Sequence, residues 1–541
     1  MRTLLWLCVL AGCANGHDAG VVTPPPGSTT LAVPASMRSA PFDVPRSLKI
    51  PAGYRIAVYT RIPSARFAVV TPDGNLLVSV PTSWSVQLVR PNANGDPLVS
   101  TYISGINNPQ GLAIHTVSGI TYLYVAETNQ VERYVWTAGQ LTPGARQVVV
   151  PGLPTGGAHP YKDLALDAND KLYVALGSSC NICIDDLTST PQRAAIYQYN
   201  ADGTGGRLYA NGLRNPEGLA ILPATNTLWV AVNERDDIPY PYHDNSGTPF
   251  GSVYGPYVDN HPPDELTSVR DGGNYGWPYC NPTPDSTSGY DNMAFDPSVD
   301  PSINDNGQVS CTTMDRVIKG IQAHSAPLGL TFTFGTNAPT EYRNGAVIGL
   351  HGSWDRSNNT GYKVVYVPFS GSLPATGTTP IDLVTGWSDA HSYWGRPVDV
   401  VVDASGRFFI TDDDAGAIYV LSAQEPAILA GTHTQHATER AHKRGLGPIT
   451  DRLGDRAQLA VLLAQQAPRR LHAPAREVLE RRLANERLEP RCERRTRHAG
   501  GGRERRQRPR PVDRAVHGLQ AFSDLRIGQP SQPARGLGAV T

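Results

Sequence analysis

The chain has 541 residues, of which 40% are hydrophobic, and a formal net charge of −1. Residues 423–541 hold 22 Arg and one Lys against 12 acidic residues, a net +11, so residues 1–422 carry −12. The length allows a large core. A basic tail of this kind can bind nucleic acid or anionic surfaces, but we do not expect this of an exported protein.

The first residues have the composition of an export signal. Met1 and Arg2 form a short basic start, Leu4 to Leu10 is apolar, and Leu-Ala-Gly-Cys ends at Cys13. The apolar stretch is too short to span a bilayer. We expect a lipoprotein signal at residues 1–13 with lipidation at Cys13; a plain cleaved signal is the alternative. The protein would then be periplasm-facing or anchored to the outer membrane by its lipid alone, or else soluble in the periplasm or secreted.

Residues 14–45 are rich in Pro, Ser, Thr and Gly and are expected to form a flexible tether. Two nearly identical hexapeptides follow, Asn-Pro-Gln-Gly-Leu-Ala at residues 108–113 and Asn-Pro-Glu-Gly-Leu-Ala at residues 215–220. Each precedes an apolar alternating run. Looser copies of this unit occupy residues 66–80, 162–176, 326–330 and 397–411.

The repeated unit predicts the fold. Its apolar residues alternate with period two, which is typical of half-buried strands, and Asp-Gly or Ala-Ser-Gly turns separate the strands. A single hairpin cannot bury its face alone, but repeated sheets packed radially can. Six copies therefore predict an all-β, six-bladed β-propeller over residues 46–422, with an inserted loop region at residues 235–325. A β-sandwich is the alternative.

Cysteine usage agrees with export. Cys180 and Cys183 form a close pair, and Cys280 and Cys311 flank a loop within residues 235–325. An oxidising compartment favours two disulfides here. A metal or redox role for the first pair is less favoured, because no second CxxC and no βαβ pattern accompany it.

The C-terminal tail at residues 423–541 is biased towards Arg, Ala, Pro and Gly and has one aromatic residue. Residues 453–483 are compatible with a helix, and the rest has no packing pattern. We expect a disordered or partly helical tail that is not part of the fold and is dispensable for function, and that could even result from out-of-frame translation.

Several loop motifs occur in one order along the body of the chain. They are Gly-Gly-Ala-His ending at His159, Gly-Leu-Arg-Asn-Pro-Glu-Gly around Arg214, Asn-Tyr-Gly-Trp-Pro at residues 274–278, His-Gly-Ser-Trp-Asp-Arg-Ser at residues 351–357, and Trp-Gly-Arg-Pro around Arg396. Taken together, they resemble the soluble quinoprotein sugar dehydrogenases, which carry pyrroloquinoline quinone (PQQ). The similarity covers about residues 45–422 and is greatest to the branch called L-sorbosone dehydrogenase-like.

The resemblance implies roles for individual residues. A loop histidine is the family's base, and that position falls on His159, whose unperturbed pKa suits proton transfer near neutrality. The family's acidic or second histidine residue before the base is Ala158 here, and Asp163 is a candidate for orienting the imidazole. An ordinary surface histidine is the alternative.

The resemblance also implies cofactor contacts. PQQ carries three carboxylates, and arginine pairs well with carboxylates. The matching positions are Gln110, Arg214, Asn215 and Arg396, with either Arg356 or Lys363 as a further cation. Salt bridges or turn positions are the alternative roles for all of these.

The family uses Ca²⁺ to polarise the quinone. The matching oxygen-rich loop offers Asn233, Glu234 and Asp236. Solvated loop charge is the alternative. Within the inserted region, Tyr240 and Tyr242, together with Trp277 and Trp354, are candidates for stacking on a sugar ring, although Trp277 is more typical of packing.

The expected function is a PQQ- and Ca²⁺-dependent oxidoreductase that oxidises an aldose or a sorbosone-like sugar aldehyde. Its electrons would pass to a respiratory acceptor, a cytochrome or a quinone. Two other classes stay open: a non-catalytic NHL-like propeller that binds carbohydrate or protein, and a Ca²⁺-dependent propeller lactonase. Clustering of His159, Arg214 and Arg396 at one mouth of the channel would favour the enzyme over the binding module.

Overall fold

The computed structural model describes residues 27–284 and 290–424. These residues are almost entirely strand, turn and loop, and they contain one short helix, α1 (Gly255–Val258). No helix in this part of the chain combines the length and apolarity needed to cross a membrane. The signal with Cys13 and the Arg-rich tail lie outside the described residues.

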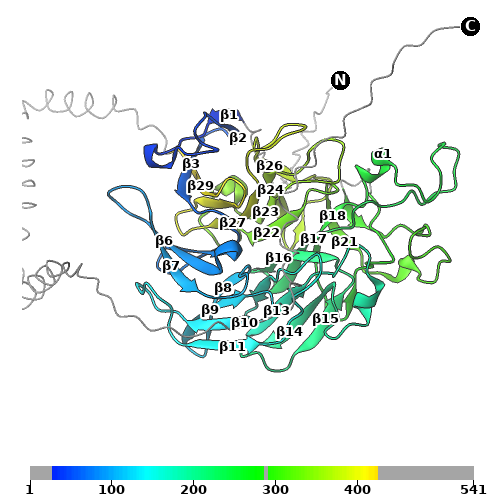
Figure 1. Ribbon diagram of the computed structural model, residues 1–541, viewed down its shortest axis with the longest axis horizontal. Coiled ribbons are helices and arrows are strands. Elements are labelled where there is room, and N and C mark those ends of the chain that lie inside the picture. The colour runs from blue at the N-terminus through cyan, green and yellow to red at the C-terminus, as the bar shows by residue number, and fades with distance from the viewer. Residues whose placement is uncertain (1–26, 285–289, 425–541) are drawn as a thin grey trace, which may run out of the picture. The chain divides into compact units, whose positions relative to one another are not determined.

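Six antiparallel sheets form the body of the molecule, as the six sequence copies predicted (Figure 1). We call them blades 1 to 6 in chain order. Blade 1 contains β4 (Ala68–Val70), β5 (Leu76–Val80), β6 (Ser85–Arg90) and β7 (Leu98–Ser104). Blade 2 contains β8 (Leu112–Val117), β9 (Ile120–Ala126), β10 (Val131–Val135) and β11 (Arg146–Val150). Blade 3 contains β12 (Leu164–Leu166), β13 (Lys171–Leu176), β14 (Ala195–Asn200) and β15 (Arg207–Asn211).

The other three blades have the same inner hairpin and more varied outer strands. Blade 4 contains β16 (Asn215–Leu222), β17 (Thr227–Asn233), β18 (Asp264–Ser268), β21 (Val317–Ile321) and β20 (Asp291–Met293). Blade 5 contains β22 (Pro327–Phe332), β23 (Gly345–Leu350), β24 (Lys363–Ser370), β25 (Leu373–Pro374) and β26 (Ile381–Val384). Blade 6 contains β27 (Pro397–Val402), β28 (Phe408–Asp412), β29 (Ala417–Ala423) and β3 (Tyr54–Arg61).

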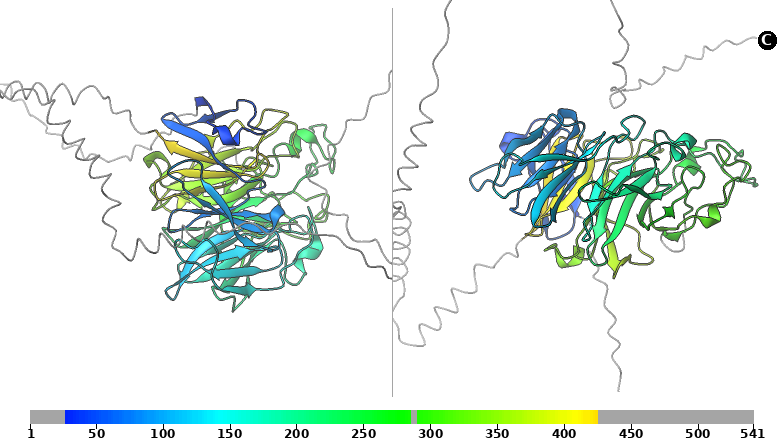
Figure 2. Two further views of the ribbon diagram at one scale, coloured as in Figure 1. Left: turned by 60° about the vertical axis from the view of Figure 1, so that its left-hand side comes forward. Right: turned by 90° about the horizontal axis from the view of Figure 1, so that it is seen from below.

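The six blades close into a ring. The innermost strand of each blade contacts that of the next blade, in the order β4, β8, β12, β16, β22, β27 and back to β4. Figure 2 shows several of these sheets lying side by side. Blade 6 joins the two ends of this ring, because β3 comes before blade 1 in the sequence but pairs with β29. The result is a six-bladed β-propeller.

The core consists of six apolar layers, one between each pair of neighbouring blades. On β5, for example, Leu76 and Val78 face blade 6 while Leu77 faces blade 2. Most of the inner strands are therefore buried on both faces, and β5 is buried throughout. The expectation of half-buried strands was wrong for these strands, because each blade lies between two others.

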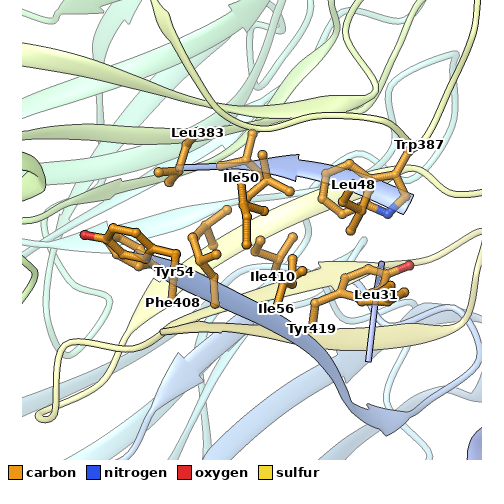
Figure 3. Close-up of a cluster of buried hydrophobic side chains, with 14 of the residues drawn as sticks. Leu31, Leu48, Ile50, Tyr54, Ile56, Leu383, Trp387, Phe408, Ile410 and Tyr419 are labelled. Carbon is orange, nitrogen blue, oxygen red and sulfur yellow. The ribbon is translucent and has the colours of Figure 1, made fainter. Parts of the chain in front are cut away.

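The segment at residues 27–50 packs against blades 5 and 6. It contains β1 (Gly27–Thr30), which pairs with β2 (Ser47–Ile50). Figure 3 shows Leu31, Leu48 and Ile50 packed with side chains of blade 6 and with Leu383 and Trp387. The prediction of a flexible tether was therefore wrong for residues 27–45. Leu31, Val33, Met37 and Phe42 are scattered through Pro- and Ser-rich sequence but enter one core layer.

The predicted loop region at residues 235–325 is only partly an insertion. It supplies β18 and β21, the outer strands of blade 4, and β19 (Gly273–Asn274), which pairs in parallel with β15 of blade 3. Five single-turn 3-10 helices occur among the described residues. They are Ala35–Met37, Pro81–Ser83, Ile184–Leu187, Cys311–Thr313 and Thr340–Tyr342.

Candidate active site

A cavity of about 260 Å³ opens at one end of the propeller. Its walls come from the loops that precede the innermost strands and from the loops that follow the second strands. In an antiparallel hairpin these two kinds of loop lie at the same end. The polar side chains that line the cavity are Arg66, His159, Arg214, Asn215, Glu217, Asn233, Glu234, Asp236, Asp264, His324, His351 and Arg396. His159, Arg214 and Arg396, which lie far apart in the sequence, therefore meet at one mouth.

His159 lies on the loop before β12 and presents one ring nitrogen as a base. Its Nδ1 lies 2.8 Å from Ser178 Oγ and 3.0 Å from the Ser178 carbonyl oxygen. Ser178 Oγ donates its own proton to the Cys180 carbonyl, so both Ser178 atoms act as acceptors. Nδ1 must therefore carry the hydrogen, and Nε2 carries the lone pair.

The electrostatic surroundings keep His159 neutral. Burial and the neighbouring Arg214 lower the pKa of His159 to about 3. The expected orienting residue was Asp163, but Asp163 Oδ2 accepts the Leu219 N–H at 2.7 Å and joins blade 3 to blade 4. Ser178 has the orienting role instead. Its position after β13, in another loop, gave no local signal in the sequence.

Arg214 lies immediately before β16, and its guanidinium group donates its hydrogen bonds to acceptors of the protein itself. Its Nη1 donates to the Glu234 carbonyl at 2.6 Å, and its Nη2 donates to Asp236 Oδ2 at 2.8 Å and to Asn181 Oδ1 at 3.0 Å. Asn215, the next residue, is buried in the same wall. Asn181 also accepts the Asp236 N–H, so it links two loops beneath the cavity.

Both predicted disulfides are present. Cys180–Cys183 closes the loop that carries Asn181, and therefore constrains a residue that contacts Arg214 and Asp236. Cys280–Cys311 connects the loops between β18 and β21. Nearby, Trp277 is 2% exposed and donates its Nε1–H to the Asn181 carbonyl, which confirms its packing role.

The opposite wall has a second network that the sequence did not predict. Arg66, before β4, donates to Asp413 Oδ2 at 2.7 Å, and Asp413 Oδ1 lies 2.8 Å from His351 Nε2. Arg66 Nε also donates to Gln110 Oε1 at 3.2 Å, and Gln110 Nε2 donates to Glu217 at 2.5 Å. Gln110 is thus fully buried behind the wall and does not line the cavity.

Arg396 reaches the cavity from the loop before β27. Its Nε donates to the His351 carbonyl at 3.1 Å and its Nη2 to the Gly352 carbonyl at 3.0 Å. The guanidinium group also lies over the rings of Tyr362 and Tyr393. Among the described residues, neither Arg396 Nη1 nor Arg66 Nη2 has a hydrogen-bond partner, so both can donate to a ligand.

One group of side chains has the spacing of a metal site. The ligand atoms of Asp236, His324 and Asp355 all lie within 4.8 Å of one another, and no other such group occurs in residues 27–284 and 290–424. His324 Nε2 is 2.8 Å from the Val258 carbonyl, so it carries the hydrogen and Nδ1 faces Asp236. Of the three predicted metal ligands, Asp236 is the only member of this group.

The other two predicted ligands make different contacts. Asn233 Nδ2 donates to the Pro327 carbonyl at 2.8 Å. Glu234 is buried, and burial raises the pKa of its carboxyl to about 8. His324 and Asp355 were missed because they come from two different loops, before β22 and after β23, which are 31 positions apart and have no local metal-binding spacing.

Four further predicted contacts are not at the cavity. Arg356 donates to the carbonyl oxygens of Asp259 and Ala323, and Lys363 on β24 pairs with Asp382 at 2.7 Å. Neither side chain lines the cavity. Tyr240 and Tyr242 pack with Tyr257 in a separate cluster. Trp354, by contrast, lines the cavity and is 72% exposed.

Comparisons with known proteins agree with this architecture. A protein of Hypocrea jecorina (strain QM6a), described as a pyrroloquinoline quinone-dependent sugar dehydrogenase, is 26% identical over 410 residues, which is 68% of this chain and 87% of that protein. The holo form of the pyranose dehydrogenase PQQ domain from Coprinopsis cinerea superposes with a TM-score of 0.57 at 19% identity, over 74% of this chain and 100% of that one.

A calcium structure of a Trichoderma reesei carbohydrate-active enzyme of family AA12 has a TM-score of 0.58 at 22% identity, over 75% of this chain and 99% of that one. At these identities the two structures establish the shared fold. The TrAA12-like family model matches residues 48–424, which include all six blades. The chain therefore belongs to the TrAA12-like family.

Proposed function

We propose that the protein is an oxidoreductase that oxidises an aldose or sugar aldehyde with PQQ and Ca²⁺ as cofactors. One observation carries this proposal: a neutral histidine with a free Nε2 shares a single cavity with guanidinium groups that have open N–H donors. The relative described as a PQQ-dependent sugar dehydrogenase supports it.

His159 is the proton acceptor in this proposal. Its Nδ1–H is held by Ser178, which fixes the ring, and Nε2 accepts the proton of the substrate hydroxyl. The low pKa keeps the imidazole neutral throughout the physiological range, so its lone pair is available. The charge of Asp236 favours the imidazolium once it has formed.

The cavity has a donor set suited to PQQ, whose three carboxylates need fixed cations. Arg66 and Arg396 each retain an open donor nitrogen, and Arg214 adds positive charge beside His159. When bound, PQQ supplies the hydride acceptor and Ca²⁺ the Lewis acid. The exposed ring of Trp354 gives a sugar a surface on which to stack.

The group formed by Asp236, Asp355 and His324 is where the chain would hold the cation. Two carboxylates suit Ca²⁺, which prefers oxygen ligands. The imidazole Nδ1 is the one nitrogen donor in the set. The expected ligands Asn233 and Glu234 would then support the loop that carries Asp236 rather than bind the metal with their side chains.

The finer expectations are part of this proposal. A sorbosone-like aldehyde is one candidate substrate, and a cytochrome or respiratory quinone would accept the electrons. The two disulfides support an oxidising compartment and hence export. The meeting of His159, Arg214 and Arg396 favours the enzyme over a non-catalytic NHL-like propeller or a lactonase.

Dye-linked dehydrogenase activity of the apoprotein against a panel of aldoses, with and without PQQ and Ca²⁺, tests the proposal. We expect activity only when both cofactors are added. His159→Gln should lower kcat by about a hundredfold or more, because it removes the base, while PQQ still binds.

A matched control is His115→Gln on β8, because His115 pairs with Asp170 and neither residue lines the cavity. This variant should turn over substrate like the unmodified protein. Absence of PQQ binding, or unchanged kcat in His159→Gln, would contradict the proposal.

A further inference from the structure

His351 is one of three histidines that line the cavity, and the proposed function above gives it no role. It lies on the loop after β23, and its Nε2 is 2.8 Å from Asp413 Oδ1. Burial alone would raise the pKa of Asp413, but His351 and Arg66 hold it well below its usual range. An ionised carboxylate only accepts hydrogen bonds, so Nε2 carries the hydrogen and Nδ1 carries the lone pair.

Nδ1 of His351 is therefore a hydrogen-bond acceptor. It has no hydrogen-bond partner among the described residues. It is also not among the unpartnered side-chain atoms that are fully buried, so part of its surface remains accessible. Because His351 lines the cavity, that access is from the cavity side. Burial also lowers the pKa of His351 to about 4, which agrees with a neutral ring.

Two arginines with open donors are linked to His351. Arg396 Nε donates to the carbonyl of His351 itself, and Arg66 shares Asp413 with the ring. Arg396 Nη1 and Arg66 Nη2 have no hydrogen-bond partners among the described residues. The wall of the cavity thus offers one acceptor and two cationic donors. This pattern matches a ligand edge that has one N–H between two carboxylates.

PQQ has such an edge: its pyrrole N1–H lies between the carboxylates at C2 and C9, on the side opposite the quinone oxygens. We propose that His351 is a positioning residue whose Nδ1 accepts the N1–H of PQQ, with Arg66 and Arg396 on the flanking carboxylates. The quinone edge then faces the wall that carries His159 and Asp236. This inference rests on the proposed function and adds the orientation of the cofactor.

The test uses two substitutions that separate the two ring nitrogens. His351→Asn places an amide oxygen near the position of Nδ1 but loses the bond to Asp413. His351→Gln places an amide near Nε2, which keeps a donor for Asp413 but removes the acceptor from the cavity. The affinity of each full-length apoprotein for PQQ is measured by isothermal titration calorimetry with Ca²⁺ present, and His115→Gln is the control.

We expect His351→Gln to weaken PQQ binding about tenfold or more, which corresponds to the loss of one hydrogen bond of roughly 1.4 kcal/mol. His351→Asn should lose clearly less, and His115→Gln should bind like the unmodified protein. A PQQ analogue methylated at N1 should bind the unmodified protein and His351→Gln with equal affinity, because it has no N1–H to donate.

A structural role for His351 predicts the opposite ranking. His351→Asn would then lose at least as much affinity as His351→Gln, and the lower thermal stability of the apo form would follow the same order. That ranking, or unchanged affinity in His351→Gln, overturns the inference but leaves the proposed function standing. Failure of the unmodified protein to bind PQQ would contradict the proposed function itself.

Discussion

Asp412, at the end of β28, is a buried carboxyl that stabilises a loop turn. Its Oδ1 accepts the N–H groups of Arg396 and Ala415, and its Oδ2 accepts the hydroxyl of Tyr419. Burial nevertheless raises the pKa of Asp412 to about 7. An unfolded chain releases this proton near pH 3.9. The folded state therefore binds the proton more tightly, and the free energy of unfolding falls as the pH rises from about 4 to about 7.

We predict that Asp412→Asn removes this pH dependence. An amide at this position keeps an oxygen for the two N–H groups and carries no charge at any pH. Relative to the unmodified protein, the variant should gain stability between pH 4 and pH 7, by at most about 4 kcal/mol. Urea unfolding at several pH values measures this difference. The exposed Asp305→Asn is the control, and parallel stability curves for Asp412→Asn and the unmodified protein would refute the prediction.

The roles of individual residues could be predicted from the sequence where the residue stands in a distinctive loop motif. His159, Arg214 and Arg396 stand in distinctive motifs, and all three reach the cavity. Other contacts at the cavity join residues from distant parts of the chain: Arg66 and Asp413, for example, are 347 positions apart. The spacing of residues in the sequence does not predict such a pair, because closure of the ring brings the first and last blades of the propeller together.

The repeated Gly-Leu-Ala of the inner strands also joins neighbouring blades. In blade 4, a Cβ on Gly218 would lie 2.1 Å from the carbonyl oxygen of Leu328 in blade 5. Buried aspartates bridge other junctions between blades: Asp163 accepts the Leu219 N–H of blade 4, and Asp399 of blade 6 accepts the Ala68 N–H of blade 1. The glycine allows the inner strands to approach, and the aspartates pair backbone groups across the gap.

Gly218→Ala should therefore destabilise the propeller by about 3 kcal/mol or more, since the carbonyl it meets belongs to a packed strand that cannot move freely. Thermal unfolding followed by circular dichroism would measure the change. Gly156→Ala is the matched control, because a Cβ there meets nothing within 4 Å and its backbone is not left-handed. Equal midpoints for the two variants would contradict this account of the junction.

At the scale of elements, the sequence predicted the inner hairpins better than the outer strands. Five of the six copies mark the first two strands of a blade, and the copy at residues 326–330 marks the start of the first strand of blade 5. The outer strands β18 and β21 of blade 4 were not identified, because long loops separate them and β21 is only five residues long. β1 was missed for a related reason: its Gly, Ser and Thr residues have no apolar alternation, and it depends on pairing with β2.

At the scale of the whole molecule, ring closure depends on the two ends of the described chain. β3 pairs with β29 from Arg61 opposite Ala417 to Tyr54 opposite Ala423. Beyond the strand, the N–H of Gln424 donates to the Gly53 carbonyl at 2.7 Å. A propeller without this strand has an open edge in blade 6 and an exposed apolar layer. Residues 54–61 thus hold blades 6 and 1 together, although β3 belongs to the sheet of blade 6 alone.

We therefore predict that a chain ending at residue 427 keeps the melting temperature and PQQ affinity of the full protein, because every blade is complete within it. A chain lacking residues 27–61 should not unfold cooperatively, since β29 loses its partner and Ile56 and Val58 leave the layer between blades 5 and 6. Differential scanning calorimetry of the two shortened proteins distinguishes these outcomes. A cooperative transition in the second protein would mean that blade 6 closes without β3, and a lower melting temperature in the first would assign a stabilising role to residues 428–541.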